Sequence, residues 1–247
     1  MTLVTSVKST ADLPLDKSAP SIRRMFGRIA PRYDLLNHLL SAGQDIWWRA
    51  RAAKRLDPKP GERILDLGSG TGDLAVALSR RGRGARITAA DFTFEMLAIG
   101  KGKVGAAPSP IVQAQADAMK LPFSPASFDA AAAAFSVRNF EGLEAGLREV
   151  WRILKPGGRF LILEFAPEPV GIMKPFILAY CRLVLPVVGR LVSGEQGAYT
   201  YLPDSVRRWP APKALAETLQ RSGFAKVDVV PLSFGVAVMH LARKGAA

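Results

Sequence analysis

Short apolar runs alternate with segments of helical periodicity from residue 60 onward. The five strand-like runs are RILDL, RITAAD, IVQAQ, FDAAAAAF and GRFLILEF, at 63–67, 86–91, 111–115, 128–135 and 158–165. Between the runs, apolar residues recur three and four positions apart, as in Leu143, Leu147 and Val150. This alternation predicts right-handed βαβ units and a parallel sheet with helices on both faces. The final stretch, AKVDVVPLSFGVAVMHLARK, predicts an antiparallel hairpin.

Three regions follow from the same pattern. Residues 1–20 lack a sustained apolar period and are expected to be a flexible leader, without the basic start and apolar run of a signal peptide. Residues 21–60 are expected to form a helical cap in two pieces, broken near Pro31. The rest, 61–247, is expected to be the main α/β domain, with 166–210 inserted after the fifth strand.

Residues 171–192 are the most apolar long segment. Lys174, Arg182 and Arg190 recur through it and prolines interrupt it, so burial across a bilayer would be costly. We interpret it as a helix packed on the core or as an apolar wall for a lipid-like substrate or a membrane. The single cysteine, Cys181, lies in this segment and indicates a reducing compartment, which favours a cytoplasmic location.

The net charge of the chain indicates which kinds of partner it can bind. The chain has 34 Lys and Arg against 21 Asp and Glu, a net charge of +13. Such a balance favours nucleic acid or an anionic membrane surface as a partner, or is simply a basic solvated surface. With two histidines and one cysteine, and no carboxylates at metal-loop spacing, no metal site is expected.

The turn ILDLGSGTGDLA, at 64–75, carries the clearest chemistry. Gly68, Gly70 and Gly72 are two residues apart, which differs from the spacing of nicotinamide and flavin sites, and no Gly-Lys-Ser/Thr follows as in a P-loop. Asp73 after the glycines is also poorly placed for a pyrophosphate. These exclusions leave a ligand that carries no negative charge at the turn but needs close approach to the backbone, which glycine permits. S-adenosylmethionine, with a cationic sulfonium, fits this description.

Acidic residues follow three of the predicted strands. Asp66 ends the first strand, Asp91 ends the second, and Asp117-Ala118 follows the third. Because ligands of open α/β sheets bind at the carboxyl ends of strands, these acids are expected to lie at the cofactor, with Asp91 where the ribose of a nucleoside would lie. The alternative is that Asp66 and Asp91 cap local turns or helices.

At this point the chain resembles the class I S-adenosylmethionine-dependent methyltransferases. Further blocks, FGRIAPRYDLLNHLLSAG, FSVRN, EVWRILKPGGRFLILEF, YTYLPDSV and FGVAVMHLA, resemble those of the UbiE/MenG quinone-biosynthesis C-methyltransferases. The resemblance implies a doubly wound, mostly parallel seven-stranded sheet of Rossmann-like α/β class. It also implies methylation of a ring carbon of a polyprenylated demethylquinol, either demethylmenaquinol or the ubiquinone precursor. Ala134, where ubiquinone-type members often have serine, favours menaquinol.

The resemblance also implies roles for individual residues. It places the cofactor at Thr71, Asp91, Asp117 and Ala118, beside the glycine turn of Asp66, Gly68 and Gly70. Arg138 is the leading catalytic candidate, as a cation that stabilises the phenolate or orients a water that accepts its proton; the alternative is a structural ion pair. Tyr33, Asn139 and Tyr201 are expected at the substrate, with packing or helix capping as alternatives.

Other interpretations remain open. His38 and His240 lie in apolar surroundings that favour structural roles over that of a base, and Glu164 ends the fifth strand near the site. A polyprenyl substrate and the basic charge favour peripheral attachment to a membrane, and a homo-oligomer is possible. The alternative functions are a cofactor-binding scaffold without catalysis and an RNA methyltransferase. RNA methyltransferases usually have an Asn/Asp-Pro-Pro-aromatic run or a catalytic cysteine near the fourth strand. This chain has neither there, so no nucleic-acid partner is expected.

Overall fold

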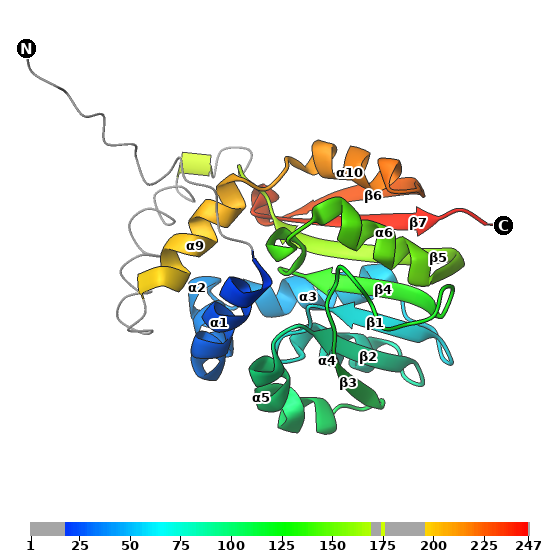
Figure 1. Ribbon diagram of the computed structural model, residues 1–247, viewed down its shortest axis with the longest axis horizontal. Helices are drawn as coiled ribbons and strands as arrows, with labels where there is room; N and C mark the ends of the chain where they lie inside the picture. Colours follow the sequence, from blue (N-terminus) through cyan, green and yellow to red (C-terminus); the bar gives the residue numbers. More distant parts are fainter. Residues whose placement is uncertain (1–17, 169–173, 176–195, 247) are drawn as a thin grey trace, which may run out of the picture.

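A computed structural model describes residues 18–168, 174–175 and 196–246, without the side chains of Ala19 and 196–200. A seven-stranded sheet forms its centre (Figure 1). The strands are β1 Arg63–Leu67, β2 Arg86–Asp91, β3 Ile111–Gln115, β4 Phe128–Ala134, β5 Leu154–Phe165, β6 Phe224–Leu232 and β7 Ala237–Lys244. The described helices of three or more residues are α1 Ala19–Ile29, η2 Ala30–Arg32, α2 Tyr33–Leu40, α3 Gln44–Leu56, α4 Asp73–Arg81, α5 Phe94–Gly105, η3 Val137–Asn139, α6 Leu143–Ile153, α9 Gln196–Arg207, α10 Pro212–Arg221 and η5 Ser233–Gly235.

The sheet order is β3-β2-β1-β4-β5-β7-β6, and only β7 runs antiparallel to its neighbours β5 and β6. The chain leaves β1 toward β2 and β3, and it leaves β4 toward β5, so the strand order reverses between β1 and β4. Connections after these two strands diverge and leave a crevice at the carboxyl ends of the strands, where open α/β sheets bind ligands. The predicted doubly wound fold and final hairpin are confirmed.

Two separate cores cover the two faces of the sheet. On one face, α6 and α10 pack through residues such as Leu147 and Leu215. On the other, α3 and α4 pack through residues such as Trp48 and Leu78. Strands β1 and β4 supply apolar side chains to both cores, because their central position buries both faces. Asp66, near the carboxyl end of β1, is therefore held on a rigid frame.

The fifth strand starts earlier than the sequence predicts. Leu154 pairs with Phe128 of β4, and the next pair joins Arg159 to Ala130, so four residues of β5 face one of β4. Residues 155–158, which precede the predicted strand at 158–165, therefore form a bulge within β5, with Gly157 at φ +72°.

The cap contains three α-helices rather than the two predicted pieces. The break at Pro31 is present as η2, but a second break separates α2 from α3 at residues 41–43. Ala42 and Gly43 adopt positive φ values of +50° and +74° there, which ends α2. Helix α1 begins at Ala19, two residues before the predicted start of the cap at residue 21.

No helix in the described part of the chain is long and apolar enough to cross a bilayer. The segment 171–192, with Cys181, lies outside the described residues apart from Lys174 and Pro175. Helix α9 lies in the predicted insertion at 166–210 and contacts α1 and η3, so this part of the insertion stands beside the cap.

Candidate active site

The turn between β1 and α4 presents bare backbone at the crevice. Gly68, Gly70 and Gly72 have φ values of +67°, +56° and +93°, in the left-handed region that favours glycine. A Cβ at Gly68 would also lie 2.4 Å from the Cβ of Ser136, which follows β4. Backbone conformation and close packing therefore both exclude a side chain at Gly68.

Asp91 is tied to this turn. One carboxylate oxygen accepts the N–H of Gly70 at 2.7 Å and the other accepts the N–H of Thr93 at 2.8 Å. Burial raises the pKa of Asp91, and these hydrogen bonds oppose the rise. Thr93, rather than Asp91, is the N-cap residue of α5. Each carboxylate oxygen can accept more than one hydrogen bond, so Asp91 retains acceptor capacity for a ribose.

Asp117 and Ala118 follow β3. Asp117 is exposed, and one of its carboxylate oxygens accepts the N–H of Met119 at 2.8 Å, which orders the short turn. Asp117, Ala118 and Met119 form one wall of the main cavity. This wall provides one carboxylate and an apolar surface, which suits the amine and the flat face of an adenine.

The main cavity opens at the crevice between β1 and β4, with about 810 Å³ of empty space that is partly open to solvent. The predicted cofactor and substrate residues that line it are Tyr33, Gly68, Gly70, Asp91, Asp117, Ala118 and Asn139. The charged side chains among its described lining residues are all acidic: Asp91, Asp117 and Glu141. A cavity of this sign, in a chain of net charge +13, favours a cationic ligand over a polyanion.

Asp66 lies beneath the turn in a smaller cavity that adjoins the main one, since Tyr33, Gly68 and Gly70 line both. The residue is 1% exposed, and neither carboxylate oxygen has a hydrogen-bond partner. Burial raises the pKa of Asp66 to about 7, although the backbone N–H of Ala75, in the first turn of α4, and then the positive charge of Arg49 act to lower it. The Asp66 carboxylate keeps acceptor capacity for a cation.

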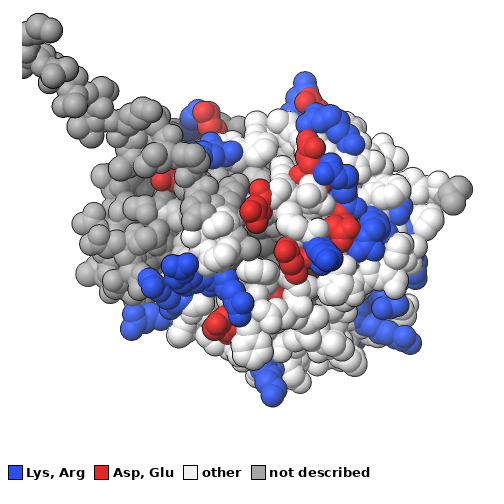
Figure 2. Space-filling view, viewed as in Figure 1, with Lys and Arg blue, Asp and Glu red and all other residues white. Residues whose placement is uncertain are grey.

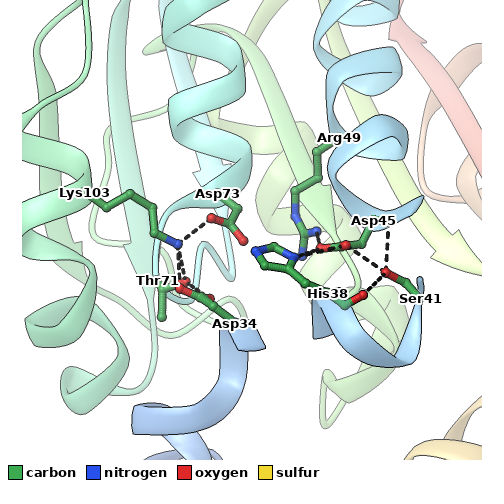
Figure 3. A network of polar contacts seen from close by, with 8 residues as sticks. All are labelled: Asp34, His38, Ser41, Asp45, Arg49, Thr71, Asp73 and Lys103. Atoms are coloured by element: carbon green, nitrogen blue, oxygen red, sulfur yellow. Dashed lines mark hydrogen bonds and ion pairs between the residues drawn. The ribbon is translucent and has the colours of Figure 1, made fainter. Parts of the chain in front are cut away.

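Thr71 joins the turn to the cap (Figure 3). Its hydroxyl donates to Asp34 of α2 at 2.5 Å, and Lys103 of α5 donates to the same hydroxyl at 3.2 Å. Lys103 also pairs with Asp34, at 2.7 Å, and with Asp73. The Thr71 hydroxyl is thus hydrogen-bonded to Asp34 of the cap and to Lys103, and the Thr71 backbone forms part of the turn.

Arg138 lies in η3, directly after β4, and is 5% exposed. Its guanidinium donates to Glu164 at 2.9 Å and to the carbonyl of Phe135 at 2.5 Å. Its Nε is buried without a partner, and the residue does not line the main cavity. The structural ion pair considered from the sequence is therefore present, and Glu164 is its acidic member.

Asn139 and Tyr201 meet at the site. The Tyr201 hydroxyl, on α9, donates to the side-chain oxygen of Asn139 at 2.9 Å. Burial raises the pKa of Tyr201 to about 12, against the lowering effect of Arg138. Burial also raises the pKa of Tyr33. Both hydroxyls are therefore hydrogen-bond donors at neutral pH, rather than bases.

The histidines make structural contacts. His240 donates to the carbonyl of Pro212 at 2.9 Å, and burial lowers its pKa. His38 pairs with Asp45 at 2.9 Å, and Asp73 lies close to both. These three are the described residues that come near enough together to hold a metal ion, but Arg49 and Lys103 already pair with the two carboxylates.

Sequence reasoning missed Arg49 and Phe135. Arg49 of α3 is 6% exposed beside Asp66, and Phe135 lines the main cavity with φ +59°, unusual for an aromatic residue. The spacing of Asp45 and Arg49, four apart on a helix with buried Trp48 and Ala52, was a usable signal for a buried ion pair.

These residues fit S-adenosylmethionine. Asp91 stands where a ribose would lie, Asp117 and Ala118 form a wall suited to adenine, and the unpartnered Asp66 offers a carboxylate to an ammonium group. The glycine turn admits close approach, and the acidic lining suits a sulfonium.

Comparison with known proteins supports the same assignment. The model of the ubiE/COQ5 methyltransferase family matches residues 15–244. The chain belongs to this family. The family resemblance and the predicted methyltransferase class, with S-adenosylmethionine as its cofactor, are confirmed.

The chain is similar to proteins named demethylmenaquinone methyltransferase from several bacteria. That of Thermus thermophilus is 48% identical, over 88% of this chain and 98% of the relative. That of Deinococcus radiodurans is 44% identical, over 91% and 92% respectively. That of Chlorobaculum tepidum is 40% identical, over 98% and 100%.

Solved structures share the fold at lower identity. A SAM-dependent methyltransferase from Aquifex aeolicus has a TM-score of 0.59 at 19% identity, over 79% of this chain and 88% of that one. The [4+2]-cyclase SpnF has a TM-score of 0.67 at 20% identity, over 93% and 97%. Because one of these is named a cyclase, the fold alone does not determine the reaction.

Gly100 of α5 provides a test of the packing behind the turn. A Cβ there would lie 2.4 Å from the backbone oxygen of Thr71, whereas nothing lies within 4 Å of a Cβ at Gly102 on the same helix. We expect Gly100→Ala to lower the free energy of unfolding by about 1–3 kcal/mol through overpacking. Gly102→Ala should raise it by up to about 1 kcal/mol. Urea denaturation measures both, and equal stability of the two variants would contradict the packing described.

Proposed function

We propose that this chain transfers a methyl group from S-adenosylmethionine to a ring carbon of demethylmenaquinol, a quinol with a polyprenyl tail. The proposal is supported by the family and by the names of relatives that cover nearly the whole chain. The observation that carries it is the main cavity, where the acids after β2 and β3 meet the aromatic residues of the cap and of the segment after β4. Cofactor and ring substrate would share this space.

The chemistry needs a ring carbon made nucleophilic by loss of a proton from the neighbouring hydroxyl. When bound, the cofactor supplies an electrophilic methyl group on sulfur. Phe26, Tyr33, Phe135 and Phe140 give the cavity flat apolar walls suited to a quinol ring. Asn139, oriented by the Tyr201 hydroxyl, offers its amide N–H groups to a quinol oxygen. Alignment of the two reactants in a dry pocket is the main contribution that these residues make.

The direct test offers the full-length protein methyl-labelled cofactor with demethylmenaquinol, with the demethylated ubiquinone precursor and with RNA, each analysed by mass spectrometry. We expect the quinol to gain one methyl group on a ring carbon, and Asp91→Asn to reduce both cofactor binding and product. Cofactor binding without turnover on any quinol would favour the scaffold alternative. Methylated RNA would contradict the proposal.

Arg138 has a positioning role in this proposal rather than direct contact with the ring. Its guanidinium holds the carbonyl of Phe135 and the Glu164 carboxylate, which fixes the segment that carries Phe135 and Asn139 at the cavity. Its positive charge also lowers the pKa of Tyr33 and of Tyr201. The same field favours the developing phenolate.

Paired substitutions separate this role from simple stability. Arg138→Met leaves Glu164 buried and unpaired, which should cost about 3–5 kcal/mol of stability. Adding Glu164→Leu removes the stranded charge and should restore most of the stability. We expect kcat of the double variant to stay roughly 100-fold low, with the acid limb of its pH profile moved to higher pH. Recovery of kcat together with stability would show that Arg138 is structural only.

Peripheral attachment to an anionic membrane completes the proposal, because a polyprenyl tail places the substrate in a bilayer. Figure 2 shows Lys and Arg side chains gathered over α1, where Arg23, Arg24 and Arg28 are exposed. The following helices expose apolar side chains at their solvent side: Leu35, Leu39, Ile46 and Trp47. Exposed tryptophan beside cationic side chains suits the interface of a bilayer.

Sedimentation with vesicles tests the attachment. The protein should sediment with phosphatidylglycerol vesicles, remain in solution with pure phosphatidylcholine, and detach as salt rises. Trp47→Ser should weaken the binding several-fold, whereas Val112→Ser, at an exposed residue of β3, should leave it unchanged. Absence of binding at low salt would refute the attachment, and equal effects of the two variants would refute the cap as its surface.

A further inference from the structure

The small cavity beneath the glycine turn contains unpartnered polar groups. Both carboxylate oxygens of Asp66 and the hydroxyl oxygen of Ser69 are buried there without a hydrogen bond. Buried polar groups in proteins are nearly always paired, so these groups give the cavity hydrogen-bonding capacity for a polar ligand. This cavity adjoins the main cavity at Gly68 and Gly70, so one ligand can occupy both.

Opposite charges meet in this cavity from two parts of the fold. Asp66 comes from β1, and Arg49 comes from α3 of the cap. The two residues are 1% and 6% exposed. The guanidinium acts on the Asp66 carboxylate through its charge, yet the structure gives no hydrogen bond between them. Both groups therefore keep hydrogen-bonding capacity for something placed between them.

Arg49 is held in place by the cap itself (Figure 3). One guanidinium nitrogen donates to Asp45 at 2.5 Å, and the guanidinium stands 5.3 Å from the ring centre of Phe135. Asp45 also accepts the hydroxyl of Ser41 at 2.8 Å and the ring N–H of His38 at 2.9 Å. Burial acts to raise the pKa of Asp45, but these partners together lower it. Asp45 thus stays ionised and leaves most of the five guanidinium donors unused.

We propose that Arg49 binds the carboxylate of the cofactor's methionyl group while Asp66 accepts its ammonium group. An α-amino acid carries these two opposite charges on one carbon, and the cavity offers a buried partner for each. Guanidinium groups suit carboxylates because their donors form a planar fork. This inference rests on the cofactor named in the proposed function, and it makes the N-terminal cap a part of the cofactor site.

Calorimetry with ligands that lack one or both charged groups of the amino-acid end tests the proposed roles of Arg49 and Asp66. S-adenosylhomocysteine carries both charged groups, its decarboxylated analogue keeps only the ammonium, and 5′-methylthioadenosine has neither. Measurements at about pH 8 keep Asp66 ionised, above its folded pKa of about 7. Wild-type protein should bind the first ligand most tightly and the third most weakly.

Arg49→Met should weaken the binding of S-adenosylhomocysteine by about 10- to 100-fold, the value of a charge-assisted hydrogen bond. Its affinity for the other two ligands should stay within about threefold of wild type. The matched control is Arg55→Met on the same helix, which breaks an exposed pair with Asp228 and should change none of the three affinities. Asp66→Asn should weaken both ligands that carry the ammonium group.

Each of the other outcomes would contradict a specific part of the proposal. If Arg49→Met weakens S-adenosylhomocysteine and its decarboxylated analogue equally, Arg49 acts only through Asp66 and the carboxylate contact is wrong. An unchanged affinity also overturns it. If wild-type protein binds no nucleoside ligand, the proposed function itself fails. Should Arg49→Met not fold, a crystal structure of wild-type protein with S-adenosylhomocysteine decides, because the carboxylate must lie within hydrogen-bond distance of Arg49.

Discussion

Asp66 is buried at the end of β1 without a hydrogen-bond partner, and a carboxylate in such a place stays ionised only beside positive charge. Burial is the largest cause that raises its pKa, to about 7. The sheet holds this unfavourable group rigidly because β1 is covered on both faces by the two cores. The bare glycine turn above it lets a ligand approach. A ligand with a cationic group would offset the free-energy cost of the buried Asp66 carboxylate.

The cavity and the surface carry opposite charge. The chain has a net charge of +13, but the charged residues that line the described main cavity are acidic. A cationic methyl donor therefore finds a favourable local field inside a basic protein. The outer arginines of α1 and the net charge serve a different purpose in the proposed function, which is attraction to an anionic membrane surface.

The cap is joined to the sheet by two polar networks rather than by apolar packing alone. Lys103 and Thr71 hold Asp34 of α2, and Arg49 of α3 reaches the cavity that contains Asp66. Ile22 and Phe26 of α1 then line the main cavity. In the proposed function, the cap both closes the substrate space and contributes the charge of Arg49 to the cofactor site.

The fold was largely predictable because strands and helices each have a characteristic local pattern of apolar residues in the sequence. The positions of Gly68, Asp91 and Asp117 were predictable for a related reason, since strand ends of a parallel sheet meet at one edge. For Arg49 the sequence offered only the spacing of a helical ion pair with Asp45, because its place beside Asp66 depends on which face the cap turns to the sheet. Arg138 illustrates the limit of topology, which placed it after β4 but did not show that Glu164 engages its guanidinium.

Proton release on ligand binding tests the central claim most directly. Burial raises the pKa of Asp66 to about 7, so part of the protein holds the Asp66 proton at neutral pH. An ammonium group beside the carboxylate lowers that pKa, and binding must then expel the proton. Calorimetry of S-adenosylhomocysteine binding at pH 7, in buffers of different ionisation enthalpy, should show proton release that Asp66→Asn abolishes. Proton uptake, or release that is unchanged in Asp66→Asn, would contradict the account.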